Sequence, residues 1–90
     1  MPEETLFESE RVMSRDDVAE YLRTLADSVA AGSDVTLRAG DQSVTLTPPS
    51  EVKFEVKAER EGPTDGDGEL GIEVELEWPE NATDGTLSIE

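Results

Sequence analysis

Two segments in the second half of the chain alternate between apolar and mostly charged residues. The apolar members are Val52, Phe54, Val56 and Ala58 in the first segment, and Leu70, Ile72, Val74, Leu76 and Trp78 in the second. Because successive side chains on a strand point to opposite faces, each segment predicts a strand with one apolar and one charged face. The residues between them, 61–68, are rich in Gly and Asp and predict a hairpin loop.

The register of this hairpin also follows from the pattern. Symmetric closure pairs Phe54 with Leu76 and Val56 with Val74, and sets Lys53 opposite Glu77 and Lys57 opposite Glu73. A shift by one residue would expose the whole apolar set, so only a shift by two is an alternative.

An amphipathic helix is predicted over residues 15–31. Ser14 is a suitable N-cap, and Gly32 suits a left-handed C-terminal cap. The apolar stripe consists of Val18, Leu22, Leu25 and Val29.

A second hairpin is predicted around Gly40-Asp41, with Leu37 facing Val44, Val35 facing Leu46, and Thr36 opposite Thr45. Residues 5–13 alternate less regularly and offer a further first strand. We therefore expect an α+β fold: an antiparallel four- to five-stranded meander with one amphipathic helix packed on its apolar face. Residues 1–78 would form a single domain, and 79–90 a polar C-terminal tail that is disordered or adds an edge strand.

The charge of the chain limits the classes of molecule that it can bind. Its 23 acidic and 7 basic residues give a formal net charge of -16, spread along the whole sequence. Such a field repels nucleic acid and anionic membranes and gathers monovalent cations loosely. Dispersed acid with only two lysines, Lys53 and Lys57, favours a halophilic protein. An ordinary acidic domain and an acidic mimic of nucleic acid are the alternatives.

The chain contains no cysteine and no histidine, which excludes Ser-His-Asp and Cys-His centres. The Asp65–Glu69 loop resembles part of a calcium loop but lacks the later ligands, so neither a metal site nor a cofactor is expected. No apolar run approaches the ~20 residues that span a bilayer. The first residues lack the basic start and apolar core of a signal peptide, which favours a cytoplasmic location.

The candidate interaction residues are Trp78, Tyr21, Glu73, Glu75 and Glu77. Trp78 is interpreted as closing the end of the core beside Val52 or as part of a contact patch, since tryptophan is enriched at interfaces. Tyr21 lies off the main helical stripe. The three glutamates share the wet face of one strand, where an exposed surface offers no pocket for catalysis.

The order of segments resembles the amphi-Trp domain family. LFESERVMSRDDVAEYLRTLADSVAAG is followed by a V-T-L hairpin and Pro-Pro, and then by EVKFEVKAER and ELGIEVELEW, which ends on Trp78. The likeness covers roughly residues 5–78. It implies an uncharacterised domain with no assigned activity, cofactor or catalytic residue.

The leading hypothesis is therefore a non-enzymatic module for protein–protein interaction, either an adaptor or a homodimer. The first alternative is an acidic decoy for nucleic-acid-binding proteins, which would use Glu73, Glu75 and Glu77. The second is a cation- or small-ligand-binding domain that uses the loop at 65–69.

Overall fold

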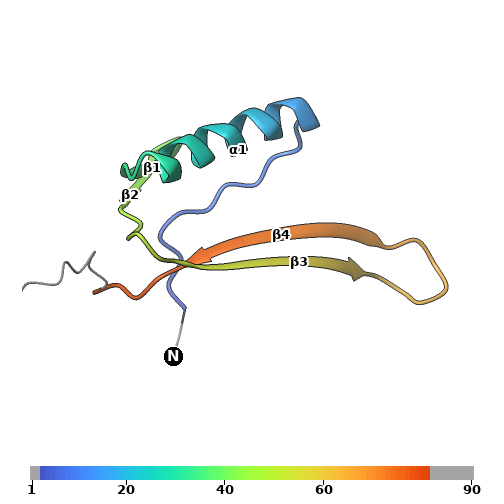
Figure 1. Cartoon of the computed structure of the whole chain (residues 1–90). Helices are drawn as coiled ribbons and strands as arrows, with labels where there is room; N and C mark the ends of the chain where they lie inside the picture. Colours follow the sequence, from blue (N-terminus) through green and yellow to red (C-terminus); the bar gives the residue numbers. More distant parts are fainter. Residues whose placement is uncertain (1–2, 82–90) are drawn as a thin grey trace, which may run out of the picture. The chain divides into compact units, whose positions relative to one another are not determined.

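The computed structural model describes residues 3–81. The chain divides into two compact units, residues 1–48 and 49–90. The first unit contains helix α1 (Arg15–Ala30) and strands β1 (Val35–Ala39) and β2 (Gln42–Leu46). The second contains β3 (Lys53–Glu61) and β4 (Glu69–Glu77) (Figure 1). No helix in the described part of the chain is long and apolar enough to cross a membrane.

Both ends of α1 carry the caps that the sequence predicts. The Ser14 hydroxyl accepts a hydrogen bond from the Asp17 backbone N–H at 3.1 Å. At the other end Gly32 has φ 68 and donates to the Val29 carbonyl, while Ser33 donates to the Ser28 carbonyl. This pair of bonds is a Schellman motif, which places glycine at the left-handed position. The helix ends at Ala30, one residue before the predicted end.

The β1–β2 hairpin has the predicted register. Leu37 pairs with Val44, Val35 with Leu46, and Thr36 with Thr45. The two threonine hydroxyls are hydrogen-bonded at 3.0 Å, which adds a cross-strand contact on that face. Gly40 turns the chain with φ 59, a positive value that a two-residue hairpin turn needs.

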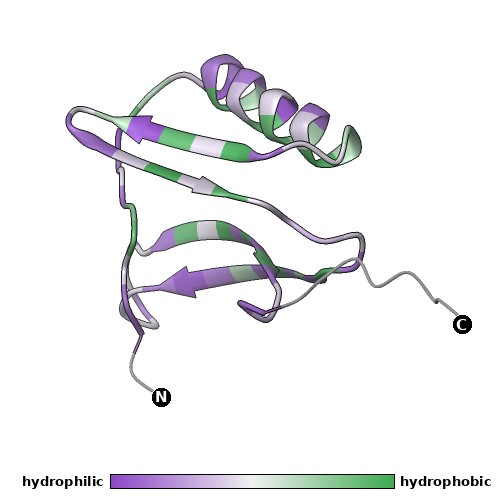
Figure 2. Cartoon of the chain, turned by 90° about the vertical axis from the view of Figure 1, so that its left-hand side faces the viewer, coloured by the Kyte–Doolittle hydropathy of each residue, from purple (hydrophilic) through white to green (hydrophobic). Residues whose placement is uncertain are grey.

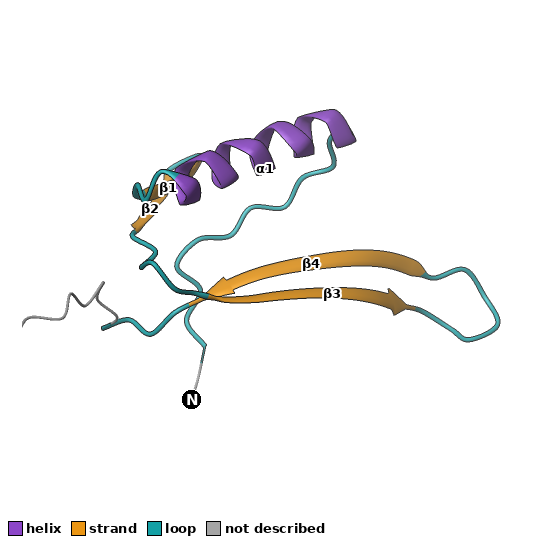
Figure 3. Cartoon of the chain, viewed as in Figure 1, coloured by secondary structure: helices purple, strands orange, loops and turns teal. Residues whose placement is uncertain are grey.

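The β3–β4 hairpin also has the predicted register. Phe54 pairs with Leu76, Val56 with Val74, Lys53 with Glu77 and Lys57 with Glu73. The paired strands are nine residues each and are joined by the loop at residues 62–68 (Figure 3).

The expected single meander is not confirmed, because β1 pairs with β2 and β3 pairs with β4 in two separate two-stranded sheets. Residues 5–13 were the predicted first strand. In the structure they form a loop before α1, so this strand prediction is wrong. In this loop the Glu8 backbone exchanges two hydrogen bonds with the side chain of Gln42. The segment is thus tied to β2 through one side chain and not through a ladder.

Packing within the helical unit is shallow. Helix α1 contacts β1, but Leu22 on the predicted apolar stripe remains 54% exposed. No residue of the described part of the chain is fully buried. The half-buried apolar residues of this unit include Phe7, Met13, Leu25, Val35, Val44 and Leu46. The predicted packing of the helix on an apolar sheet face is not confirmed, since the structure shows only this contact between α1 and β1.

Residues 79–81 follow β4 as a loop and the beginning of a turn. The rest of the predicted tail, including Leu87 and Ile89, lies outside the described residues. The division into a domain at 1–78 and a tail at 79–90 therefore stays a prediction.

Candidate interaction surface

The β3–β4 hairpin exposes a continuous apolar face. This apolar face consists of Phe54, Val56 and Ala58 of β3 and Leu70, Ile72, Val74 and Leu76 of β4. The exposed fraction is 63% for Phe54, 86% for Leu70 and 80% for Ile72. Val56 and Val74 are 59% and 52% exposed. Hydrophobic and hydrophilic positions alternate along the strands (Figure 2), so the exposed apolar side chains gather on one side of the sheet.

The opposite side of the hairpin, the glutamate face, is densely charged. It carries Lys53, Glu55, Lys57, Glu59, Glu61, Glu69, Glu73, Glu75 and Glu77. The Lys53 Nζ lies 3.8 Å from the Glu77 carboxylate, as the register predicts. The Lys57 Nζ instead lies 3.5 Å from Glu59 on its own strand. The charge of Glu59, followed by those of Glu55 and Glu73, raises the pKa of Lys57.

Glu75 lies in the middle of the glutamate face, directly opposite Glu55. A hydrogen bond with the Glu77 side chain and the negative charge of Glu77 raise the pKa of Glu75 above the ordinary carboxyl value, and Glu55 adds to this effect. Like charges in register across two strands are destabilising. The backbone pairing of β3 with β4 therefore keeps these carboxylates close together although they repel one another.

Four of the five predicted interaction residues lie in one unit. Glu73, Glu75 and Glu77 share the glutamate face of β4, and the half-buried Trp78 follows directly after that strand. Tyr21 belongs to the other unit, where its side chain is 65% exposed on α1.

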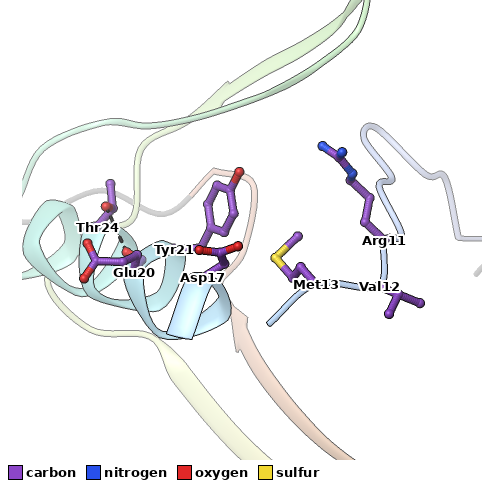
Figure 4. Close-up of a pocket in the computed structure, with 7 residues that line it drawn as sticks. All are labelled: Arg11, Val12, Met13, Asp17, Glu20, Tyr21 and Thr24. Carbon is purple, nitrogen blue, oxygen red and sulfur yellow. Dashed lines mark hydrogen bonds between the residues drawn. The ribbon is translucent and has the colours of Figure 1, made fainter. Parts of the chain in front are cut away.

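Tyr21 borders a hollow of about 500 Å³ between α1 and the segment that precedes it. Figure 4 shows Asp17, Glu20 and Thr24 on the helix side and Arg11, Val12 and Met13 on the other. A second hollow of about 730 Å³ extends from Tyr21 and Met13 to β1, and Arg11 and Arg38 both border it. Glu20 is ion-paired with Arg23 at 2.8 Å, and the Thr24 hydroxyl donates a hydrogen bond to the Glu20 carbonyl. The Glu20 carboxylate and the Thr24 hydroxyl, which both border the smaller hollow, therefore already have partners within α1.

The 62–68 loop is organised around Arg60. Its Nη2 donates to the carbonyls of Pro63 and Gly66 at 2.9 and 3.0 Å. The acids of this loop, Asp65 and Asp67, belong to no group of three or more potential metal ligands within residues 3–81. The loop thus has a structural organiser, which the sequence reasoning missed because the loop bonds come from backbone carbonyls and carry no residue signature.

Sequence reasoning also missed the exposed apolar face, since it assigned all of these residues to a core. The alternation that defines the face was visible, but alternation does not say what lies against it. The described part of the hairpin unit contains only β3, β4 and loops, so its apolar face has no second layer of its own.

The model of the Amphi-Trp domain family matches residues 1–90. The chain belongs to the Amphi-Trp domain family. The match confirms the resemblance found in the order of segments, and it extends over both units. Comparison with characterised proteins and with solved structures gives no match. The match identifies the family of the chain but assigns no activity to it.

Proposed function

We propose that this Amphi-Trp chain is a non-enzymatic protein-interaction module that binds through the apolar face of its β3–β4 hairpin. One observation carries the proposal: five large apolar side chains gather on one face, each 52–86% exposed. Contiguous exposed apolar surface on a protein commonly marks a site of interaction. Trp78 is half-buried and directly follows β4, and tryptophan is a residue type enriched at the centres of interfaces.

The surroundings of the apolar face support a protein as the partner. Nucleic acid would meet the carboxylates of the opposite face, and a net charge of -16 repels its phosphates as well as anionic lipid headgroups. The same charge accumulates monovalent cations loosely, which suits a halophilic protein working in the cytoplasm.

The two alternative functions have weaker support. An acidic decoy would present an unbroken row of carboxylates, yet Lys53 and Lys57 interrupt the glutamate face. Cation binding at 65–69 would use a loop whose carbonyls at Pro63 and Gly66 already bind Arg60. Small-ligand binding would use the hollows beside Tyr21. The smaller hollow is bordered by Arg11, Asp17 and Glu20, and the larger one by Arg11 and Arg38 with no acidic side chain, so the two hollows do not share one ligand chemistry.

A matched pair of variants tests the proposed function. Ile72→Gln places an amide on the apolar face, whereas Gly71→Gln places the same amide at the neighbouring position on the glutamate face. Nothing lies within 4 Å of a Cβ at Gly71, so this control fits without strain. In a high-salt pull-down we expect the parent and Gly71→Gln baits to retain a stoichiometric protein partner, and Ile72→Gln to lose most of it. Equal recovery by all three baits would show that the apolar face is not the binding surface.

A further inference from the structure

The larger hollow on the helical unit, taken by itself, offers a single ligand chemistry. Its volume is about 730 Å³, which lies within the range of about 300–1,000 Å³ that is typical of small-molecule sites. Every residue that borders it lies between positions 7 and 40, so the hollow belongs entirely to the unit at residues 1–48. It is therefore a feature of one compact unit and is distinct from the apolar face of β3–β4.

Acidic side chains are absent from the border of this hollow, although they are abundant in the chain. The sequence contains 23 acidic residues among 90, yet none of them borders the larger hollow. Alternate residues of the segment before α1 border it, namely Phe7, Ser9, Arg11 and Met13. Glu8 and Glu10 lie between these positions and do not. This segment thus presents apolar and basic side chains to the hollow and keeps its carboxylates outside it.

Two arginines supply the positive charge of the hollow. Arg11 comes from the segment before α1 and Arg38 from β1, and both side chains are exposed. Within residues 3–81 neither arginine takes part in an ion pair or a side-chain hydrogen bond. Both guanidinium groups are therefore available to an external anion. A guanidinium binds a carboxylate through two parallel N–H···O hydrogen bonds, which gives the contact a defined geometry.

The rest of the wall suits an apolar group. Phe7 and Met13 are half-buried, and Tyr21 presents its ring from α1. Figure 4 shows Arg11 and Met13 projecting from the segment before α1 toward the side of the helix that carries Tyr21. Aromatic rings and a thioether form favourable contacts with apolar and aromatic groups. The hollow thus combines an apolar wall with a basic border.

The adjoining smaller hollow indicates where a negative group would lie. It shares Arg11 and Tyr21 with the larger hollow, but Asp17 and Glu20 also border it. Because these carboxylates repel an anion, the negative group of a ligand should lie at the end near Arg38. The net charge of -16 opposes each further negative charge on the ligand. This favours a singly charged carboxylate over a phosphate, which carries about two charges at neutral pH.

We infer that the larger hollow binds a small organic carboxylate with an apolar body. The carboxylate contacts Arg38 and Arg11, and the apolar body lies against Tyr21, Met13 and Phe7. This inference goes beyond the proposed function, because it concerns the other unit and a different class of partner.

Titration of the full chain with phenylacetate, followed through amide chemical shifts at one fixed salt concentration, tests the inference. We expect saturable shifts confined to the residues that border the hollow. Phenylethanol has a similar apolar body without the charge and should bind about tenfold more weakly, because it cannot form charge-assisted hydrogen bonds. Benzyl phosphate should also bind more weakly than phenylacetate.

Three arginine-to-glutamine variants locate the charge that is used. Arg38→Gln should raise the dissociation constant of phenylacetate about tenfold, and Arg11→Gln should raise it as well. Arg15→Gln is the matched control. It removes an equal charge from the first residue of α1, which borders neither hollow, and should leave the dissociation constant close to that of the parent. Circular dichroism establishes that each variant is folded.

Three results would overturn the inference. The first is the absence of saturable shifts at the bordering residues. The second is a loss of selectivity, in which phenylethanol binds as well as phenylacetate or Arg15→Gln weakens binding as much as Arg38→Gln. The third is tighter binding of benzyl phosphate, which would replace the carboxylate by a phosphate. None of these results affects the pull-down with Ile72→Gln, so the inference and the proposed function fail independently.

Discussion

At the scale of single residues, the crowded carboxylates of the glutamate face give the clearest consequence. Glu77 and Glu55 raise the pKa of Glu75 in the folded protein, so the folded state holds this proton more tightly than the unfolded state. Stability from this site is then present at low pH and is lost as pH rises through the carboxyl range.

We therefore expect the urea midpoint, measured at about 0.1 M salt, to rise when the pH is lowered from about 7 through the ordinary carboxyl range to about 4. Glu75→Gln should raise the midpoint at neutral pH and flatten this dependence, because it removes the central charge of the row. Glu80→Gln removes an equal charge beyond the end of β4 and should leave the pH dependence close to that of the parent. A steeper dependence in Glu75→Gln than in the parent would contradict the electrostatic argument.

At the scale of elements, the loop that connects β3 to β4 brings the backbone of Gly68 close to that of Glu61. A Cβ at Gly68 would overlap the carbonyl oxygen of Glu61 and lie 3.2 Å from the Arg60 guanidinium. Gly68→Ala must therefore displace the loop that Arg60 organises. We expect a loss of about 1–2 kcal/mol in the free energy of unfolding, by analogy with overpacked sites.

Urea unfolding followed by Trp78 fluorescence measures this loss, since Trp78 directly follows β4. The matched control is Gly71→Ala on β4, three residues beyond the loop position, where a Cβ meets nothing within 4 Å. Its stability should stay within about 0.5 kcal/mol of the parent. Equal effects at Gly68 and Gly71 would mean that the loop tolerates displacement freely.

The elements that sequence reasoning placed correctly are those with local signals. Ser14 and Gly32 bound the helix through bonds to residues within a few positions, and Gly40 fixes the β1–β2 register through its own φ. Alternation fixed the β3–β4 register because a one-residue slip inverts the faces. Each of these constraints is satisfied within one element or one hairpin.

Prediction failed where the partner is distant in sequence or lies outside the element. Residues 5–13 have a weak strand pattern, and their tie to β2 is a single glutamine, Gln42, that no periodicity reveals. Phe54 and Ile72 have the pattern of core residues, yet a pattern records only that a side chain avoids water. Whether its cover is a strand, a helix or a second chain depends on contacts that alternation does not encode.

At the scale of the whole molecule, the high net charge and the small amount of buried surface both lower the free energy of unfolding. A charge of -16 on 90 residues destabilises any compact state through self-repulsion, and no described residue is fully buried to oppose it. Salt screens the repulsion between exposed carboxylates, and at high concentration it also strengthens the burial of apolar surface. Both effects favour the folded state.

Thermal melts from about 0.1 M to about 3 M potassium chloride, followed by Trp78 fluorescence, should therefore show a continuous rise in Tm. A gain of about 2 kcal/mol would correspond to a shift of about 8–16 °C for a domain of this size. The protein concentration must be held fixed, because any association of the folded chain would raise Tm by mass action. Replacing Glu73 and Glu75 together by lysine should reduce the rise, since fewer like charges remain to be screened. A Tm that is flat or falls with salt would remove the halophilic interpretation, because self-repulsion would then not be what limits the stability of this chain.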